Sequence, residues 1–210
     1  MKNLITMKVI NYKENRAMLM DTPHKRVDDL AVIYQIDLPV DKESTGTIRI
    51  TDAEKERFGV STEQLHELAM TNTRRLYPPV LSTMEAVMFK NAENLLENPM
   101  EAKSDMLYIL TNTRGAQGAT SILYPDVLEQ AKQIIGSDFY VLPSSIHEMI
   151  LVSKEHGMPP KELGEMVREV NANQVRRDEK LSDHVYEIDF SEKQLKTVKE
   201  SLPREKSYER

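Results

Sequence analysis

The sequence contains no cysteine among its 210 residues. This absence excludes disulfides, thiolate zinc sites, iron–sulfur clusters and a cysteine nucleophile. Glycine and proline number only 7 and 10, too few for a low-complexity chain. Uninterrupted apolar stretches run for a few residues only, so no transmembrane helix and no membrane partner are expected, and the Met1 end lacks the hydrophobic region of a signal peptide. We therefore expect a soluble, cytoplasmic protein.

Basic side chains are outnumbered by acidic ones. The chain has 28 Lys and Arg against 34 Asp and Glu, a net charge of −6. Affinity for nucleic-acid backbones comes from clustered basic residues, so nucleic acid is not an expected partner unless Arg74, Arg114 and Arg176 gather on one face. The length suits one ordinary domain or two small lobes that share a core.

Three segments in the first quarter of the chain have the composition of strands. Residues 4–10 and 30–36 are apolar and rich in β-branched side chains, and residues 47–50 alternate between apolar and polar. The polar, turn-rich stretch before residue 47 predicts a hairpin between the second and third of these strands.

Four helices are indicated by capping residues and apolar periodicity. Ser61 and Ser82 each precede a Gln or Glu at capping-box spacing, and the helix after Ser82 has apolar positions spread over residues 84–96. The third helix follows Asp126 and ends at Gly136, a residue suited to a left-handed C-terminus. The fourth follows two consecutive prolines.

The second half of the chain is expected to hold two hairpins, one further strand and a last helix. These elements are a hairpin of residues 106–110 with 120–124, a hairpin of residues 138–142 with 146–152, a strand at 185–189 and a capped helix after Ser191. Antiparallel hairpins with helices between them favour an α+β fold with a mixed, mainly antiparallel sheet over a doubly wound parallel sheet.

Composition shifts predict about two lobes. Residues 1–100 form an N-terminal α+β lobe, residues 104–190 a C-terminal α+β lobe, and residues 191–210 a charged helical tail, with the boundary near residues 98–104. The core is expected to include nine apolar residues. They are Val32, Leu68, Val87, Ile122, Leu128, Ile135, Val141, Ile150 and Val167.

Seven ordered blocks of sequence carry a family resemblance. They are residues 7–12, 23–24 with 29–32, 75–79, 118–125, 136–148, 166–171 and 181–186. Together they resemble a bacterial family known only as a domain of unknown function, number 5688, over residues 6–189. The resemblance implies no activity, cofactor or catalytic residue, because that family is uncharacterised.

Longer members of that family carry additional sequence ahead of the first block, and this chain does not. If that sequence normally covers the sheet, the strand at residues 4–10 exposes an unpaired edge or an apolar face. Strand pairing or helix packing across a two-fold axis would cover it, and a homodimer is one expectation. Three alternatives stay open: the strand sits centrally in its sheet, the charged tail after Ser191 covers it, or Lys2 and Lys8 are enough to discourage pairing.

The segment of residues 143–148 carries the most suggestive side chains. Ser144, Ser145, His147 and Glu148 could supply a nucleophile, a base and an orienting group, as in a small hydrolase or transferase. However, strand alternation places the His147 and Glu148 side chains on opposite faces, and no Gly-x-Ser-x-Gly elbow surrounds either serine. A hairpin turn whose serines bond the backbone is the favoured interpretation.

Two further groups of residues could bind a ligand. Arg74 and Arg75 together with Arg114 could hold a carboxylate or phosphate, although exposed solubilising arginines explain them as well. The amides of Asn171 and Asn173 could bind a ligand, or these residues could end a helix in the left-handed conformation.

Histidines supply no metal motif. The stretch His24-Lys25-Arg26 followed by two aspartates could form a metal or phosphate site, but a solvated loop is favoured. His66-Glu67 lacks the second histidine four residues after the first that a zincin requires. No metal and no cofactor are expected.

These features favour a non-enzymatic binding or regulatory module of a bacterial cytoplasm, with an unknown protein or a small ligand as its partner. The alternative is a small hydrolase or transferase that uses Ser144 or Ser145 with His147. An enzyme requires a concave pocket in which a hydroxyl reaches an imidazole, whereas a module requires a groove or patch.

Overall fold

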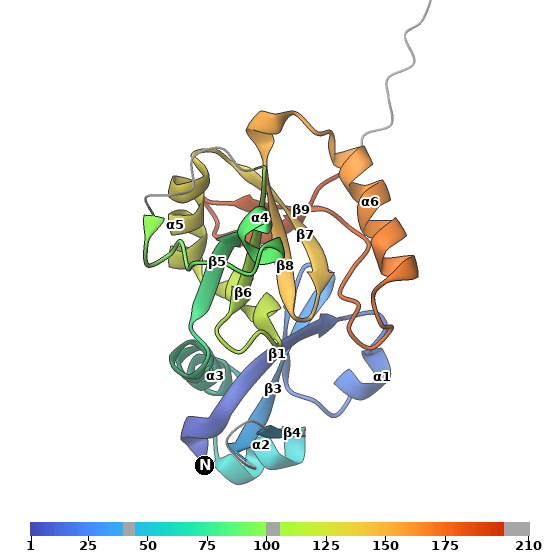
Figure 1. The fold of residues 1–210 in the computed structure, drawn as a ribbon. Coiled ribbons are helices and arrows are strands. Elements are labelled where there is room, and N and C mark those ends of the chain that lie inside the picture. Colours follow the sequence, from blue (N-terminus) through green and yellow to red (C-terminus); the bar gives the residue numbers. More distant parts are fainter. Residues whose placement is uncertain (40–44, 100–105, 200–210) are drawn as a thin grey trace, which may run out of the picture.

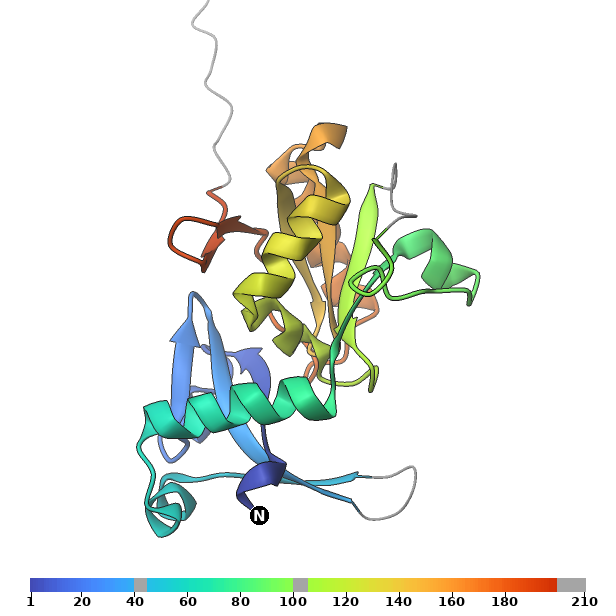
Figure 2. The ribbon, with the colours of Figure 1, turned by 90° about the vertical axis from the view of Figure 1, so that its left-hand side faces the viewer.

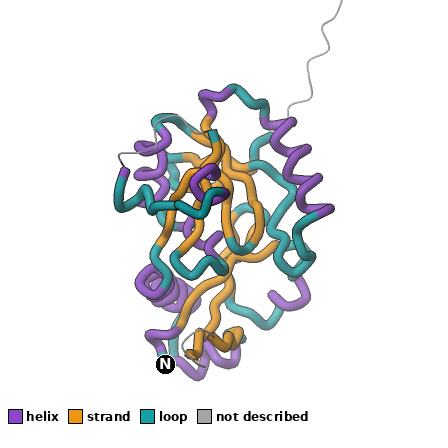
Figure 3. The backbone as a smooth tube through the Cα atoms, viewed as in Figure 1, coloured by secondary structure: helices purple, strands orange, loops and turns teal. Residues whose placement is uncertain are grey.

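The computed structural model describes residues 1–39, 45–99 and 106–199. In this part of the chain, two antiparallel sheets of four and six strands pack with helices, which confirms the expected α+β fold. Figure 1 shows the first sheet, in blue, below the second, which runs from green to red. Figure 3 shows the strands in the interior of the molecule, with helices on the outside.

The central strand of the first sheet is β3 (Leu30–Pro39). It pairs with β1 (Ile5–Asn11) along one edge, and with β2 (His24–Val27) and then β4 (Thr45–Arg49) along the other. Its first eight residues are buried because both faces of the strand are covered, which explains its long apolar run. The strands and hairpin expected in this region are confirmed.

The long helix α3 (Thr62–Leu76) lies across the first sheet (Figure 2) and begins with the expected Ser61–Gln64 capping box. It also covers the outer edge of β1, where the Met7 amide donates to Thr73 Oγ1 at 3.0 Å and Asn72 Nδ2 donates to the Ile5 carbonyl at 3.0 Å. Ile5, Met7 and Val9 are buried. The edge whose exposure motivated the predicted homodimer therefore already has partners within the chain.

Two short helices flank these strands. α1 (Arg16–Leu19) follows β1, and α2 (Asp52–Phe58) follows β4. α2 is not among the predicted helices, although Thr51 and Glu54 form a complete capping box at its start and Gly59, with φ of 63°, ends it. Seven residues are too few for a clear apolar period, so the caps were its only sequence signal.

The second sheet has the strand order β10-β9-β7-β8-β6-β5. Its strands are β5 (Pro79–Thr83), β6 (Leu107–Asn112), β7 (Phe139–Ser145), β8 (Glu148–Ser153), β9 (Tyr186–Asp189) and β10 (Gln194–Thr197). β7 and β8 form the predicted hairpin, and β9 is the predicted strand.

Helices α5 (Pro125–Ile135) and α6 (Pro160–Asn173) cover opposite faces of the second sheet, as Figure 1 shows. Alternation along β7 explains this arrangement, because Val141 packs in the same apolar cluster as α5, whereas Leu142 packs in the cluster that contains α6 residues. Both helices are confirmed, and Gly136 ends α5 with a φ of 83°.

The predicted hairpin of residues 106–110 and 120–124 is wrong in its second half. β6 is a strand, but residues 118–123 form a 3-10 helix, η3 (Gly118–Leu123). Ser121 Oγ donates to the Thr111 carbonyl at 2.6 Å, and Thr120 Oγ1 donates to the Gln117 carbonyl at 3.0 Å. These side-chain bonds favour a tight turn over an extended strand.

The predicted helix over residues 84–96 is much shorter. α4 (Met84–Met88) is capped by Thr83, whereas Ser82 lies in β5 and donates to the Glu93 carbonyl at 2.8 Å. The chain turns back after α4 and covers the free edge of β5, where the Leu95 amide donates to the Leu81 carbonyl at 2.8 Å.

The predicted helix after Ser191 is wrong, because residues 194–197 form β10 and pair with β9. The Asp189 carboxylate accepts hydrogen bonds from the amides of Ser191 and Glu192, both at 3.0 Å, and Lys193 has a φ of 54°. This aspartate turn reverses the chain where a helix was expected to begin. Residues 200–210 of the predicted tail lie outside the described residues.

Most of the predicted core is buried. Val32, Ile122, Leu128, Val141 and Val167 are buried, with exposed fractions of at most 7%. Three others, Leu68, Ile135 and Ile150, are half-buried. The prediction that Val87 belongs to the core is wrong, because α4 is a short surface helix and Val87 is 40% exposed.

One apolar cluster runs through both sheets, from Ile5 and Val32 in the first to Leu110 and Val141 in the second. The chain passes from the first sheet to the second between α3 and β5. The predicted lobe boundary at residues 98–104 falls largely on residues 100–105, outside the described residues, so the division into lobes stays a prediction.

The sheets also meet through a buried carboxylate on β3. Asp37 is 2% exposed, and its Oδ2 accepts hydrogen bonds from Tyr77 Oη at 3.0 Å and from Arg114 at 3.1 Å. Gln35 Nε2 donates to Asp37 Oδ1 at 2.9 Å and to Gln117 Oε1 at 2.7 Å. These bonds join β3 to the loop that precedes η3.

None of the helices in the described ranges is long and apolar enough to cross a membrane.

Gly118, the first residue of η3, has no room for a side chain. A Cβ there would lie 2.5 Å from the His147 carbonyl oxygen and 2.8 Å from the Asn112 amide nitrogen, and it would also overlap Thr111 Oγ1. We predict that Gly118→Ala lowers the free energy of unfolding by about 3 kcal/mol, because backbone atoms must move. Urea unfolding followed by circular dichroism measures the change.

The matched control is Gly115→Ala in the loop before η3. A Cβ at Gly115 has nothing within 4 Å, and its φ of 64° makes the substitution cost about 1 kcal/mol. Equal losses in the two variants would contradict the packing described for Gly118.

Candidate functional site

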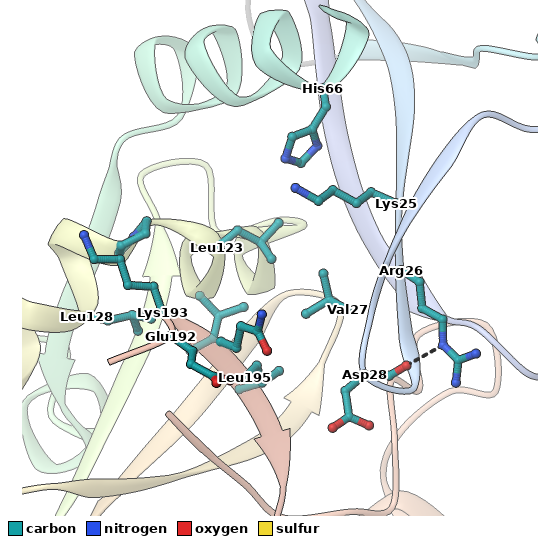
Figure 4. Close-up of a pocket in the computed structure, with 13 residues that line it drawn as sticks. Lys25, Arg26, Val27, Asp28, His66, Leu123, Leu128, Glu192, Lys193 and Leu195 are labelled. Carbon is teal, nitrogen blue, oxygen red and sulfur yellow. Dashed lines mark hydrogen bonds between the residues drawn. The ribbon is translucent and has the colours of Figure 1, made fainter. Parts of the chain in front are cut away.

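A pocket of about 430 Å³ lies between the two sheets (Figure 4). Its walls come from β2, from His66 on α3, from η3 with the start of α5, and from the turn that leads into β10. The apolar part of the lining consists of Val27, Ile122, Leu123, Leu128 and Leu195. Segments far apart in the sequence therefore build the pocket together.

Basic side chains dominate the polar part of the pocket. Figure 4 shows Lys25 reaching toward the His66 ring, with Lys193 on the opposite side. Neither lysine has an ion-pair partner among residues 1–39, 45–99 and 106–199. Arg26 turns away, since its Nε donates to the Asp28 carbonyl at 2.7 Å and its guanidinium lies 4.6 Å from the centre of the Tyr12 ring.

The two acidic residues that line the pocket are already engaged. Asp28 Oδ2 accepts a hydrogen bond from the Thr197 amide at 2.7 Å, and Glu192 lies 2.6 Å from the amine of Lys196. Lys25 and Lys193 are therefore the charged groups of the pocket that remain available to a ligand, and their charge is positive.

His66 joins this pocket to a neighbouring cavity of about 300 Å³ that Lys25 also lines. The His66 Nδ1 lies 3.1 Å from Tyr34 Oη. Burial, and then the charge of Lys25, lower the pKa of His66, and Glu67 partly opposes this shift. Burial raises the pKa of Tyr34, with Glu63 adding to the effect. These surroundings favour a neutral His66 whose Nδ1 accepts a hydrogen bond from the Tyr34 hydroxyl.

Beside the pocket, Asp29 ties the β2–β3 turn to the second sheet. Its Oδ2 accepts from Ser182 Oγ at 2.7 Å and lies 2.9 Å from His184 Nδ1, and its Oδ1 accepts from Tyr186 Oη. A serine, a histidine and an aspartate meet here, but Ser182 and Asp29 share the same ring nitrogen, Nδ1. In a catalytic triad the serine and the aspartate contact different nitrogens of the histidine ring. This cluster therefore has the role of holding the β2–β3 turn against the second sheet.

The predicted catalytic segment does not assemble a serine–histidine pair. Ser144 Oγ donates to Glu148 Oε1 at 3.1 Å, and Ser145 Oγ accepts from the His147 amide at 3.1 Å. The His147 ring is used elsewhere, because Nδ1 accepts from the Gln117 amide at 3.2 Å and Nε2 lies 3.4 Å from Glu179 Oε1. Both serines lie in β7, and the turn itself is formed by residues 146–147.

The three predicted ligand-binding arginines are held apart, each by its own partner. Arg74 makes two hydrogen bonds to the Asp126 carboxylate, at 2.9 and 2.5 Å, and Arg75 donates to the Asn3 carbonyl at 2.8 Å. Arg114 is committed to the buried carboxylate between the sheets. The structure does not gather them into one anion site.

The two predicted asparagines serve the α6 region. Asn171 Nδ2 donates to the Ser182 carbonyl and to Asp183 Oδ1, both at 2.8 Å, and Asn173 Nδ2 donates to the Glu169 carbonyl at 2.9 Å. Both lie within α6 and neither has a positive φ, so the alternative of a left-handed helix end is wrong.

Local sequence could not reveal the pocket. Residues 24–27 form β2 instead of the expected solvated loop, and Lys25 of this strand lines the pocket. Lys193 comes from a segment whose pattern predicts a helix, and His66 lies on a helix face without a motif. Lys25, His66 and Lys193 are far apart in the sequence and meet only in the folded protein, so no sequence motif contains all three. Among the described residues, no group of three His, Asp or Glu side chains could hold a metal ion.

The fold and pocket define an α+β protein with two antiparallel sheets and a ligand-sized cavity between them. The chain belongs to the family of unknown function DUF5688, whose model matches residues 1–189. This match confirms the resemblance carried by the seven sequence blocks. No curated protein and no solved structure matches the chain.

The lowered pKa of His66 predicts a pH dependence of stability. The unfolded chain takes up the proton near the ordinary histidine pKa of 6.5, whereas the folded protein takes it up only at lower pH. The unfolded state thus binds more protons in this window, so the contribution of His66 to stability is lost as the pH falls below about 6.5. We expect the free energy of unfolding of the wild type to fall relative to that of His66→Gln between about pH 7 and pH 5.

Urea unfolding at several pH values measures this difference, and His156→Gln, an exposed histidine of η4, is the control. A constant difference between wild type and His66→Gln across the range would contradict the proposed neutral state of His66.

Proposed function

We propose that the protein is a non-enzymatic binding module of a bacterial cytoplasm that takes up a small anionic ligand with an apolar part in the pocket between its sheets. The observation that carries the proposal is the pair of lysines, Lys25 and Lys193, which face this pocket without an ion-pair partner in the described ranges. The acidic residues of the lining are occupied within the protein.

The size and lining of the pocket support a small molecule. A cavity of about 430 Å³ falls within the range of roughly 300–1,000 Å³ that is typical of ligand sites. Its apolar floor and a few charged groups at the rim match the usual division of labour, in which apolar contact gives affinity and polar groups give orientation. Lysine is a point charge that suits a carboxylate, sulfonate or phosphate.

The alternative of a hydrolase or transferase gains no support from the two serine–histidine neighbourhoods. In one, His147 is engaged by Gln117 and Glu179, and in the other, Ser182 donates to Asp29 instead of to the ring. A regulatory role would follow if the bound ligand changed how the sheets meet, since the pocket is built from both. The homodimer stays a prediction that light scattering at micromolar concentration can test.

Anilinonaphthalene sulfonate is a suitable probe, because it combines an aromatic body with one negative charge. We predict binding of one probe molecule per chain, with an increase in fluorescence. In the double variant Lys25→Gln/Lys193→Gln, affinity should fall by about tenfold. Contacts to two exposed lysines contribute about 0.7 kcal/mol each, which together is the roughly 1.4 kcal/mol of a tenfold change.

The matched control is Lys13→Gln/Lys90→Gln, which removes the same charge from two exposed lysines outside the pocket. Equal loss of affinity in both double variants would contradict the proposal, as would binding of several probe molecules per chain with no effect of either variant. Circular dichroism checks that all variants are folded.

A further inference from the structure

A second cavity, of about 490 Å³, lies on the opposite face of the first sheet from the pocket between the sheets. The register of the strands shows this. Lys8, Ile33 and His24 form one row across β1, β3 and β2, and Val9, Val32 and Lys25 form the next row. Neighbouring positions on a strand point to opposite faces. Lys8 therefore faces this second cavity, and Lys25 faces the other.

Lys8 is half-buried among apolar side chains that line the same cavity, with Ile10 and Ile33 from the sheet and Ile146 from the β7–β8 turn. Its amine has no hydrogen-bond or ion-pair partner in the described part of the chain. An ammonium group without a partner is costly in such surroundings, which favour the neutral amine.

The two acidic residues whose charges act on Lys8 are engaged by other side chains. Asp178 lies 2.9 Å from Arg176, and Glu179 lies 3.4 Å from His147 Nε2. Their charges still act on Lys8, but burial is the larger effect, and it lowers the pKa of the Lys8 amine. A larger fraction of this amine is therefore neutral near pH 7 than for an exposed lysine.

At the rim of the cavity, Lys180 is paired with Asp183 at 2.7 Å. Arg177 lines the cavity, is exposed and has no ion-pair partner among the described residues. Glu14, also on the rim, is exposed and hydrogen bonds through its backbone amide to Asn11. Arg177 is thus the guanidinium that remains available to an acidic group.

We propose that this cavity binds a small aldehyde or ketone that carries a phosphate or carboxylate, that Lys8 captures its carbonyl group as a reversible imine, and that Arg177 holds its acidic group. The neutral Lys8 nitrogen adds to the carbonyl carbon and gives a carbinolamine. Loss of one water molecule, which carries away the carbonyl oxygen and the two amine hydrogens, forms the C=N bond. No oxidant or reductant takes part, and hydrolysis reverses the step.

This site is independent of the pocket between the sheets, and its test uses the unmodified protein first. Pyridoxal phosphate is the probe, since it is an aldehyde with a phosphate. The protein is mixed with one equivalent of probe near pH 7, reduced with borohydride to fix any imine, and digested for peptide mass analysis.

We expect Lys8 to be labelled about tenfold more than Lys2, an exposed lysine near the start of the chain. A larger fraction of the Lys8 amine is neutral, and the contact of Arg177 with the phosphate favours binding by about tenfold. Labelling of Lys8 at or below the level of Lys2 would overturn the proposal. It would show that the Lys8 amine is no more reactive toward a carbonyl group than that of an exposed lysine. Preferential labelling of Lys25 would overturn it as well, since the probe would then have chosen the other pocket.

The role of Arg177 is tested with Arg177→Gln against Arg16→Gln, an exposed arginine of α1 that does not line the cavity. We expect the first variant to reduce labelling of Lys8 about tenfold while labelling of Lys2 stays the same, as for loss of one charge-assisted contact. Equal labelling in the two variants would overturn the assignment of the acidic group to Arg177.

Discussion

The buried carboxylate of Asp37 is the constraint on which the arrangement of the two sheets depends. Its side chain is 2% exposed, and that of Arg114, 3.1 Å away, is 23% exposed. Removing two charges from water costs several kcal/mol for each ion, so the pair is tolerated only because further bonds satisfy the carboxylate. Tyr77 and Gln35 supply them, at 3.0 and 2.9 Å. Because the partners come from β3, from the end of α3 and from the loop before η3, these bonds are satisfied together only when the sheets meet in one orientation.

The pocket between the sheets is a consequence of that orientation. Neither sheet contains it alone, since Lys25 comes from the first and Lys193 from the turn before the last strand of the second. A second tie, from Asp29 to Ser182, His184 and Tyr186, fixes the β2–β3 turn beside the pocket. Burial raises the pKa of Tyr186, and the negative charge of Asp29 adds to this, so the hydroxyl stays protonated and donates to Asp29. The pocket is therefore shaped before any ligand arrives, which lowers the cost of ordering on binding.

Local patterns predicted much of the fold, and failed where distant contacts decide. α3, α5 and α6 were predictable because each has caps and an apolar face within one segment, and β3 because its apolar run is continuous. Residues 118–123 and 194–197 were mispredicted because their strand or helix patterns compete with turns made by Ser121 and Asp189 side chains. That Lys25 and Lys193 line the same pocket could not be predicted, because it depends on how the two sheets are joined. Lys8 was predictable as a strand residue, but the cavity that it lines also depends on Ile146, Arg177, Asp178 and Lys180, which are distant in the sequence.

Hydrogen exchange measured by mass spectrometry in the wild type, in Asp37→Asn and in Asp126→Asn shows whether the Asp37 carboxylate holds the two sheets together. We expect Asp37→Asn to weaken protection in peptides of both β3 and β6, by about 3–5 kcal/mol, because it leaves a partly buried arginine without its charge partner. Asp126→Asn breaks an ion pair with Arg74 whose side chains are 59% and 47% exposed, and it should cost at most about 1 kcal/mol. Weakened protection of β3 alone, or equal losses in the two variants, would contradict the claim that Asp37 joins the two sheets into one cooperative unit.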